Sequence, residues 1–184
     1  MRRMVVLALV LLLSAPAWAG ELEGITMPDQ ASVSGKTLHL NGMGVRKKLW
    51  IEVYVAGLYL ETPTHRASQV VSADEVKQVR MHFMTGLATK GKMDDAWDDG
   101  FEANNPDTVN SLKPRIETFK SYFGDMKDGD VVDITYIPEE GTTVVINGAK
   151  KGTIEGKDFN DALMRVWFGD HPPSSGLKSG MLGE

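Results

Sequence analysis

Arg46 is the residue whose type and position most clearly suggest chemistry. It follows Gly44 and Val45 at the entrance to the densest β-forming stretch of the sequence, residues 45–61. An arginine that reached inward there could hold a carboxylate or a phenolate, because its planar guanidinium donates paired hydrogen bonds. Taken alone, however, this setting is more typical of an exposed arginine at a strand edge.

Other residue types that carry catalysis or bind metals form no recognisable motif. The sequence has no cysteine, no G-x-S-x-G elbow, no G-x-G-x-x-G and no phosphate-binding loop, so nothing supports a Ser-His-Asp triad. The acidic run within residues 93–102 lacks the spacing of a calcium loop. No two of the histidines have metal-ligand spacing; they are His39, His65, His82 and His171. We expect neither a metal nor another cofactor, with haem bound through Met or His left as an open alternative.

The composition describes one domain of ordinary soluble type. The chain has 184 residues, of which 42% are hydrophobic and 24% charged, and its formal net charge is −5. These values exclude a disordered chain and a membrane protein with several spans. They also lack the basic balance of a general nucleic-acid binder, so no nucleic-acid partner is expected.

The first nineteen residues have the pattern of a secretory signal peptide. Arg2 and Arg3 precede an apolar run over Val5–Leu13, and the small-x-small triplet Ala17-Trp18-Ala19 ends the segment. Nine apolar residues are too few for a membrane anchor, which needs roughly 20. We therefore expect cleavage after Ala19, a single mature domain over residues 20–184 without a transmembrane segment, and a periplasmic location.

The hydrophobic pattern predicts strands in the first half of that domain. A hairpin is expected from Ala31–Ser34 and Thr37–Leu40, with Gly35-Lys36 as its turn. Asn41–Gly44 is interpreted as a break. One long curved strand is expected over Val45–Glu61, because both of its faces are apolar from Val53 onward, and a further strand over Val76–Met84.

Helices and a second group of strands are expected after residue 90. One helix carries the apolar stripe of residues 93–101, and a second runs to Met126, with Asn110 or Ser111 as its cap and Pro114 in its first turn. A meander follows over residues 131–155, with Asn147-Gly148 as a strong hairpin signal. The last helix opens at Asp158 and ends at Gly169. This order predicts an α+β fold with helices on one face of an antiparallel sheet.

Several segments in this order resemble the chalcone isomerase family, and more closely its exported bacterial chalcone isomerase-like members. The resemblance covers most of the mature chain; its segments are Leu40–Arg46, Val55–Glu61, Asp94–Phe101, Asp158–Asp170 and Leu177–Gly183. It implies an open-faced β-sandwich, in which a large antiparallel sheet carries a layer of helices over one face. The family's pocket lies between the sheet and those helices.

The resemblance also implies two uses of that pocket. The family's enzymes close a flavanone ring by attack of a phenolate on an enone that an arginine polarises, whereas its plant fatty-acid-binding members hold a carboxylate with the same arginine. Arg46 matches this arginine. The enzymes' other polar positions are not matched: Tyr54 stands for a threonine, Met93 and Gly100 fall near a tyrosine and an asparagine, and Val166 replaces a hydroxyl residue.

We therefore expect a protein that binds a small apolar or amphipathic acid, such as a fatty acid, without catalysis. Losing a donor to the developing enolate typically costs 10²–10³ in rate. The residues expected to line the ligand are Arg46, Tyr54, Met93, Trp97 and Val166. One alternative is an isomerase of the intramolecular lyase type, with Arg46 as the electrophilic group and Tyr54 as a proton donor. Another is a structural or envelope-associated protein whose cleft is only core.

Overall fold

A seven-stranded antiparallel sheet forms the body of residues 19–184, the part of the chain that this computed structural model describes. Its strands follow one another in chain order, so the sheet is a meander. They are β3 (Gln30–Val33), β4 (Lys36–Lys48), β5 (Ile51–Leu60), β6 (Lys77–Phe83), β7 (Val131–Ile137), β8 (Gly141–Ile146) and β9 (Ala149–Ile154). A separate hairpin of β1 (Ala19–Leu22) and β2 (Ile25–Pro28) precedes them.

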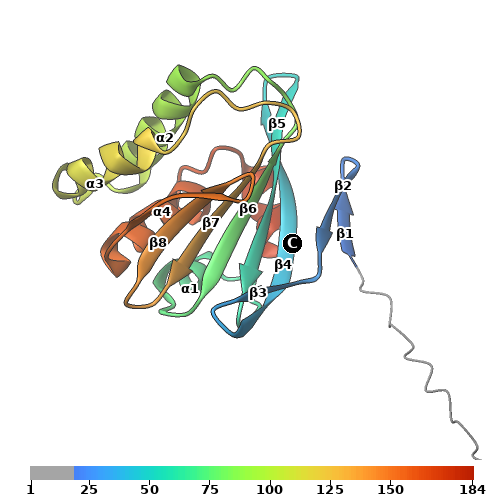
Figure 1. Ribbon diagram of the computed structural model, residues 1–184, viewed down its shortest axis with the longest axis horizontal. Helices are drawn as coiled ribbons and strands as arrows, with labels where there is room; N and C mark the ends of the chain where they lie inside the picture. The colour runs from blue at the N-terminus through green and yellow to red at the C-terminus, as the bar shows by residue number, and fades with distance from the viewer. Residues whose placement is uncertain (1–18) are drawn as a thin grey trace, which may run out of the picture.

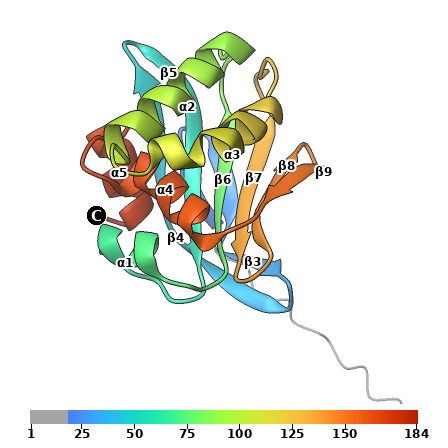
Figure 2. The same ribbon diagram turned by 90° about the vertical axis from the view of Figure 1, so that its left-hand side faces the viewer.

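Within residues 19–184, five helices cover one face of the sheet, and the β1–β2 hairpin lies on the other side (Figures 1 and 2). The helices are α1 (Ala67–Ser72), α2 (Lys90–Asn104), α3 (Val109–Ser121), α4 (Lys157–Phe168) and α5 (Ser175–Leu182). The predicted α+β architecture is confirmed, because apolar side chains of sheet and helices form one buried cluster between the two layers.

The expected signal peptide, residues 1–19, lies outside the described residues except for Ala19, the first residue of β1. Within residues 19–184, no helix combines the length and the apolarity needed to span a membrane.

The single long strand expected over residues 45–61 is wrong, because the chain turns back at Leu49 and Trp50. β4 ends at Lys48, β5 begins at Ile51, and these two residues pair across the turn. Leu49 takes a left-handed φ of 58°, which glycine or asparagine usually provides in such turns. The sequence shows no turn residue here, so its composition predicted a continuous strand.

The break expected at Asn41–Gly44 is also wrong. β4 runs through this segment with only a register shift beside Leu40. The glycines serve a different purpose: a Cβ at Gly42 would collide with the carbonyl oxygen of Gly180, and one at Gly44 would collide with that of Leu177. Their missing side chains let the backbone of α5 lie directly on the strand.

Smaller boundaries also differ from the prediction: α3 ends at Ser121, before the expected Met126. The first hairpin turns at Ser34 and Gly35, both with positive φ, one residue earlier than expected. α3 begins at Val109 after Thr108, so Pro114 is its sixth residue, not part of the first turn. The strand at 76–84, the turn at Asn147-Gly148 and the end of α4 at Gly169 are confirmed.

Aromatic rings fill the space between α2, α3 and α4. Their centroids lie 5.0–6.3 Å apart, mostly in edge-to-face or tilted arrangements that favour aromatic pairs. We call this set the aromatic cluster; it consists of Trp97, Phe101, Phe119, Phe123 and Phe159. Each member is at most 4% exposed, so this part of the interface is packed without space for a ligand.

Candidate functional site: a cleft between sheet and helices

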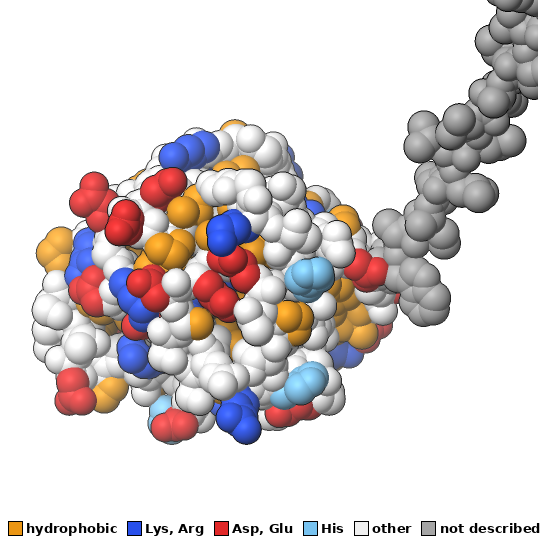
Figure 3. Space-filling view, turned by 90° about the horizontal axis from the view of Figure 1, so that it is seen from below, with side chains coloured by type: hydrophobic (Ala, Val, Ile, Leu, Met, Phe, Trp, Pro, Cys, Tyr) orange, Lys and Arg blue, Asp and Glu red, His pale blue; other side chains and the backbone are white. Residues whose placement is uncertain are grey.

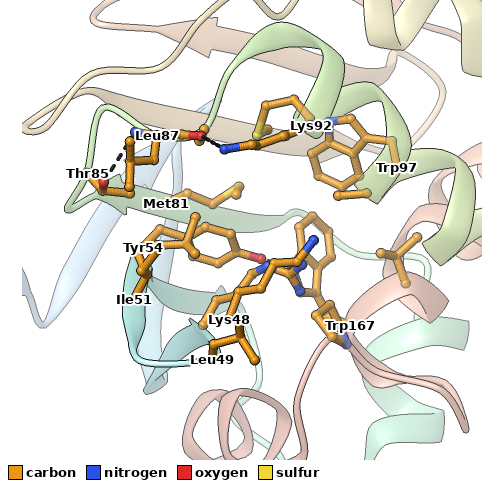
Figure 4. Close-up of a pocket in the computed structure, with 17 residues that line it drawn as sticks. Lys48, Leu49, Ile51, Tyr54, Met81, Thr85, Leu87, Lys92, Trp97 and Trp167 are labelled. Atoms are coloured by element: carbon orange, nitrogen blue, oxygen red, sulfur yellow. Dashed lines mark hydrogen bonds between the residues drawn. The ribbon is translucent and has the colours of Figure 1, made fainter.

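A cleft of about 250 Å³ opens between the β4–β5 hairpin, the start of α2 and the end of α4. Apolar side chains form most of its surface, and a few polar groups interrupt them, which is the usual composition of a small-molecule site (Figure 4). Its lining consists of Arg46, Lys48, Leu49, Ile51, Val53, Tyr54, Met81, Thr85, Leu87, Ala88, Lys92, Met93, Ala96, Trp97, Val166, Trp167 and Pro173.

Strand register brings Arg46 and Tyr54 together. They are direct cross-strand partners in β4 and β5, so their side chains project from the same face of the sheet. The register shifts immediately afterwards, where Lys47 pairs with Glu52 and leaves Val53 as an extra residue. Such a bulge turns neighbouring side chains toward one face, and both Val53 and Tyr54 line the cleft.

The Tyr54 hydroxyl is a fixed polar group in an otherwise apolar wall. It accepts a hydrogen bond of 3.2 Å from Trp167 Nε1, and Figure 4 shows it directed toward that ring. Burial raises the pKa of Tyr54, and the nearby Arg46 charge and the Trp167 bond oppose this only in part. The phenol therefore stays protonated at neutral pH, and its own proton remains available for a ligand oxygen.

The first turns of α2 and the loop before the helix supply the opposite wall. Lys92 Nζ donates a hydrogen bond of 3.0 Å to the Leu87 carbonyl, which holds this loop against the helix. One turn further on, Trp97 packs edge-to-face on Trp167 with ring centroids 5.5 Å apart. These two indoles form the inner end of the cleft, where it meets the aromatic cluster.

Every charged residue of the lining is cationic. Arg46, Lys48 and Lys92 border the cleft, and no aspartate or glutamate does. Within residues 19–184, none of the three has an acidic side chain at ion-pair distance. Arg46 is half-buried, so its charge is less screened than that of a fully exposed arginine. The site therefore favours an anion.

All five residues expected to contact a ligand border this one cleft: Arg46, Tyr54, Met93, Trp97 and Val166. Gly100, which the resemblance placed near a catalytic asparagine, lies outside the lining; a side chain there would collide with Val166. Sequence analysis missed Trp167 as a partner of Tyr54, and it missed the loop carrying Leu87. The register of the β4–β5 hairpin would have identified the wall that these two strands form.

The described residues offer no metal site of ordinary composition. Within residues 19–184, no three His, Cys, Asp or Glu side chains are close enough to share an ion. No histidine borders the cleft, and its two methionines are Met81 and Met93.

Comparison with known proteins agrees with this fold. A family model described as chalcone isomerase-like matches residues 19–183. The crystal structure of a fatty-acid binding protein from Arabidopsis thaliana superposes with a TM-score of 0.68 at 17% sequence identity, covering 90% of this chain and 96% of that one. At this identity the likeness shows the fold alone. No curated protein matches the sequence.

Proposed function

Since this chain belongs to the chalcone isomerase-like family, we propose that its cleft binds an amphipathic carboxylic acid, such as a fatty acid, without chemical conversion. The acyl chain would lie along the apolar walls and the carboxylate at the polar end. The protein of similar fold from Arabidopsis is a fatty-acid binding protein, which supports a ligand of this class. The expected signal peptide supports action in the periplasm after export.

The pairing of Arg46 with Tyr54 is the observation that carries this proposal. A guanidinium and a protonated phenol, side by side on one face of the sheet, present several donors to one carboxylate. Neither group has an acidic partner within residues 19–184 that would compete for these donors. The other lining positions on β5 and β6 are all apolar, namely Ile51, Val53 and Met81.

The same lining argues against an isomerase. Ring closure needs donors aimed at the charge that develops in the transition state, and a base where the nucleophile carries a proton. No carboxylate or imidazole borders the cleft, and the raised pKa of Tyr54 makes its phenol a poor base at neutral pH. Purified protein should therefore not cyclise chalcones above the background rate; a loss of chalcone absorbance that depends on Arg46 would favour the enzyme.

Titration of a fluorescent fatty acid tests the binding site. Arg46→Ala should weaken binding by 10- to 100-fold, because hydrogen bonds to charged groups contribute about 1.5–3 kcal/mol. Arg46→Lys should recover only part of this loss, since an ammonium cannot make the planar two-pronged contact. Mass spectrometry of ligands that co-purify with the protein identifies the natural acid.

Arg66→Ala is the matched control. This arginine is exposed, lies outside the cleft and forms no ion pair within the described part of the chain. It removes the same charge, so its affinity should equal that of the wild type. Equal affinities for Arg46→Ala and Arg66→Ala would remove Arg46 from the site and the proposal with it.

A further inference from the structure

Large apolar side chains are exposed at one place in the described residues, the mouth of the cleft. Leu49 is 80%, Trp50 85% and Leu87 53% exposed, and no other large hydrophobic residue of 19–184 is comparably open to water. Leu49 and Leu87 border the cleft on opposite sides, and Trp50 follows Leu49 at the tip of the β4–β5 hairpin. The tip and the loop both project at the top of Figures 1 and 2.

The backbone at this tip is unfavourable for the residue it carries. Leu49 has a φ of 58°, in the left-handed region where any Cβ crowds the following carbonyl. Glycine or asparagine would relieve this strain, and a polar residue would be better hydrated. Neither the folded chain nor its solubility accounts for a leucine and a tryptophan here, which points to an apolar contact outside the chain.

A lysine lies beside the apolar residues on each side of the mouth. Lys48 adjoins Leu49, and Lys92 donates to the carbonyl of Leu87 on the other side of the mouth. The charged residues of the cleft lining are all cationic, although the whole chain has a net charge of −5. At the other end, seen from below in Figure 3, acidic and basic side chains are interspersed over the face.

We propose that the mouth of the cleft docks on an anionic lipid surface, with Leu49, Trp50 and Leu87 entering the boundary between headgroups and acyl chains. Tryptophan favours this boundary because its ring is apolar and its N–H is polar. Lys48 and Lys92 lie where they would meet anionic headgroups, and a lysine near such a surface adds ~5-fold to affinity. A protruding tip inserts into lipid readily, whereas a stable protein interface needs about 800 Å² from each partner.

Docking in this orientation would place the opening of the cleft against a source of acyl chains. This consequence rests on the proposed function, whereas docking itself does not. The two can fail separately, because vesicle binding is measured without free fatty acid, and fatty-acid binding is measured without vesicles.

Co-sedimentation with vesicles tests docking directly. The protein is isolated after expression of the full chain, and every variant carries the same N-terminus, so differences between variants report on the mouth. Wild-type protein should sediment with vesicles of equal parts phosphatidylglycerol and phosphatidylcholine. It should stay in solution with phosphatidylcholine alone, and high salt should weaken its binding. Tryptophan emission should shift to shorter wavelength on binding.

Two variants and one control separate the contributions. Trp50→Ser should lower vesicle affinity about tenfold, because it removes a large apolar side chain from the contact, and should abolish the emission shift. Trp50 does not line the cleft, so fatty-acid affinity in solution should be unchanged. Lys48→Glu should weaken binding to anionic vesicles, whereas Lys150→Glu, the same change on exposed β9, should have less effect.

Vesicle binding by Trp50→Ser equal to that of the wild type would overturn the proposal. So would self-association of the wild type, measured by sedimentation in the absence of lipid, that Trp50→Ser abolishes, because the tip would then be an interface between copies of this chain.

Discussion

The interface between sheet and helices is filled at one end and hollow at the other. Around Phe119, the aromatic cluster closes the space between three helices, whereas beside Ala96 the same layers leave the cleft open. Trp97 belongs to both regions, since its ring packs on Phe119 at 5.0 Å and also borders the cleft. The difference lies in the side chains supplied, because the cleft has Ala88, Ala96 and Val53 where the cluster has phenylalanines.

This contrast teaches that the hollow is a property of particular residues, not of the fold. A core that leaves apolar space unfilled gives up packing energy, and natural proteins accept such losses where binding or catalysis needs the space. Substitutions at the filled end should therefore change stability, and substitutions at the hollow end should change binding.

The largest effect is expected from Phe119→Ala in the filled region. Phe119 is fully buried and contacts four other aromatic rings, so its removal leaves a cavity that the rigid neighbours cannot close. The free energy of unfolding should fall by about 3–5 kcal/mol, measured by urea denaturation. A loss below about 1 kcal/mol would show that this region is not close-packed.

Filling the hollow should have the opposite signature. Ala96→Phe places a ring in the cleft, so fatty-acid affinity should fall by more than about 30-fold, or roughly 2 kcal/mol, while the unfolding midpoint changes little. Ala103→Phe is the control, because Ala103 is exposed on the same helix and lies outside the cleft. Unchanged affinity in Ala96→Phe would mean that the ligand binds elsewhere.

Tyr54→Phe sharpens the comparison at the polar end of the cleft. The change removes one donor to the ligand, so affinity should fall about tenfold, less than in Arg46→Ala. It also leaves Trp167 Nε1 without its acceptor, which should cost about 1 kcal/mol of stability. Calorimetric titration and thermal unfolding of one preparation measure both; a stability loss without an affinity loss would make Tyr54 purely structural.

The last prediction changes the pH instead of a side chain and concerns Lys77, a buried charge on β6. Its Nζ donates 2.7 Å hydrogen bonds to the carbonyls of Val70 and Ala73 at the end of α1, yet burial lowers its pKa from 10.5 to about 8. Between pH 8 and 10.5 the unfolded chain binds more protons at this site, so stability should rise with pH.

From pH 7 to 9.5, Lys77 should add about 1–2 kcal/mol to the free energy of unfolding. Tyr59, whose pKa burial raises to about 12, acts in the opposite direction only above about pH 10. Urea denaturation at the two pH values measures the slope, and Lys77→Met provides the reference. Identical slopes in the two proteins would show that Lys77 is not responsible.

Much of this architecture was predictable because hydrophobic period and turn residues agree along most of the chain. The Asn147-Gly148 turn and the stripe of α2 follow from local chemistry alone. The turn at Leu49 and Trp50 was not predictable, since it lacks every residue type that normally makes one. Gly42 and Gly44 led to a wrong prediction for the reverse reason. Glycine often forms turns, but these two glycines allow α5 to lie close to β4, which only the tertiary structure shows.

The candidate site could also be predicted only in part. Arg46 was identified through family resemblance, and its own setting favoured an ordinary surface charge. Its pairing with Tyr54 depends on the register of a hairpin whose turn the sequence does not announce. The bond from Trp167 to Tyr54 joins residues 113 positions apart, which no local pattern encodes.

The contact of α5 with the glycines of β4 has a consequence for biosynthesis. Gly42 and Gly44 lie shortly before Arg46, and the helix that rests on them, residues 175–182, is made long after the strand. A nascent chain that stops before Ser175 could pair all seven strands of the sheet. Strand β4, which carries Arg46, would still lack the helix α5 that packs on it. Contacts between segments far apart in the sequence form late in folding, so β4 gains this cover only after residues 175–182 have been made and have folded.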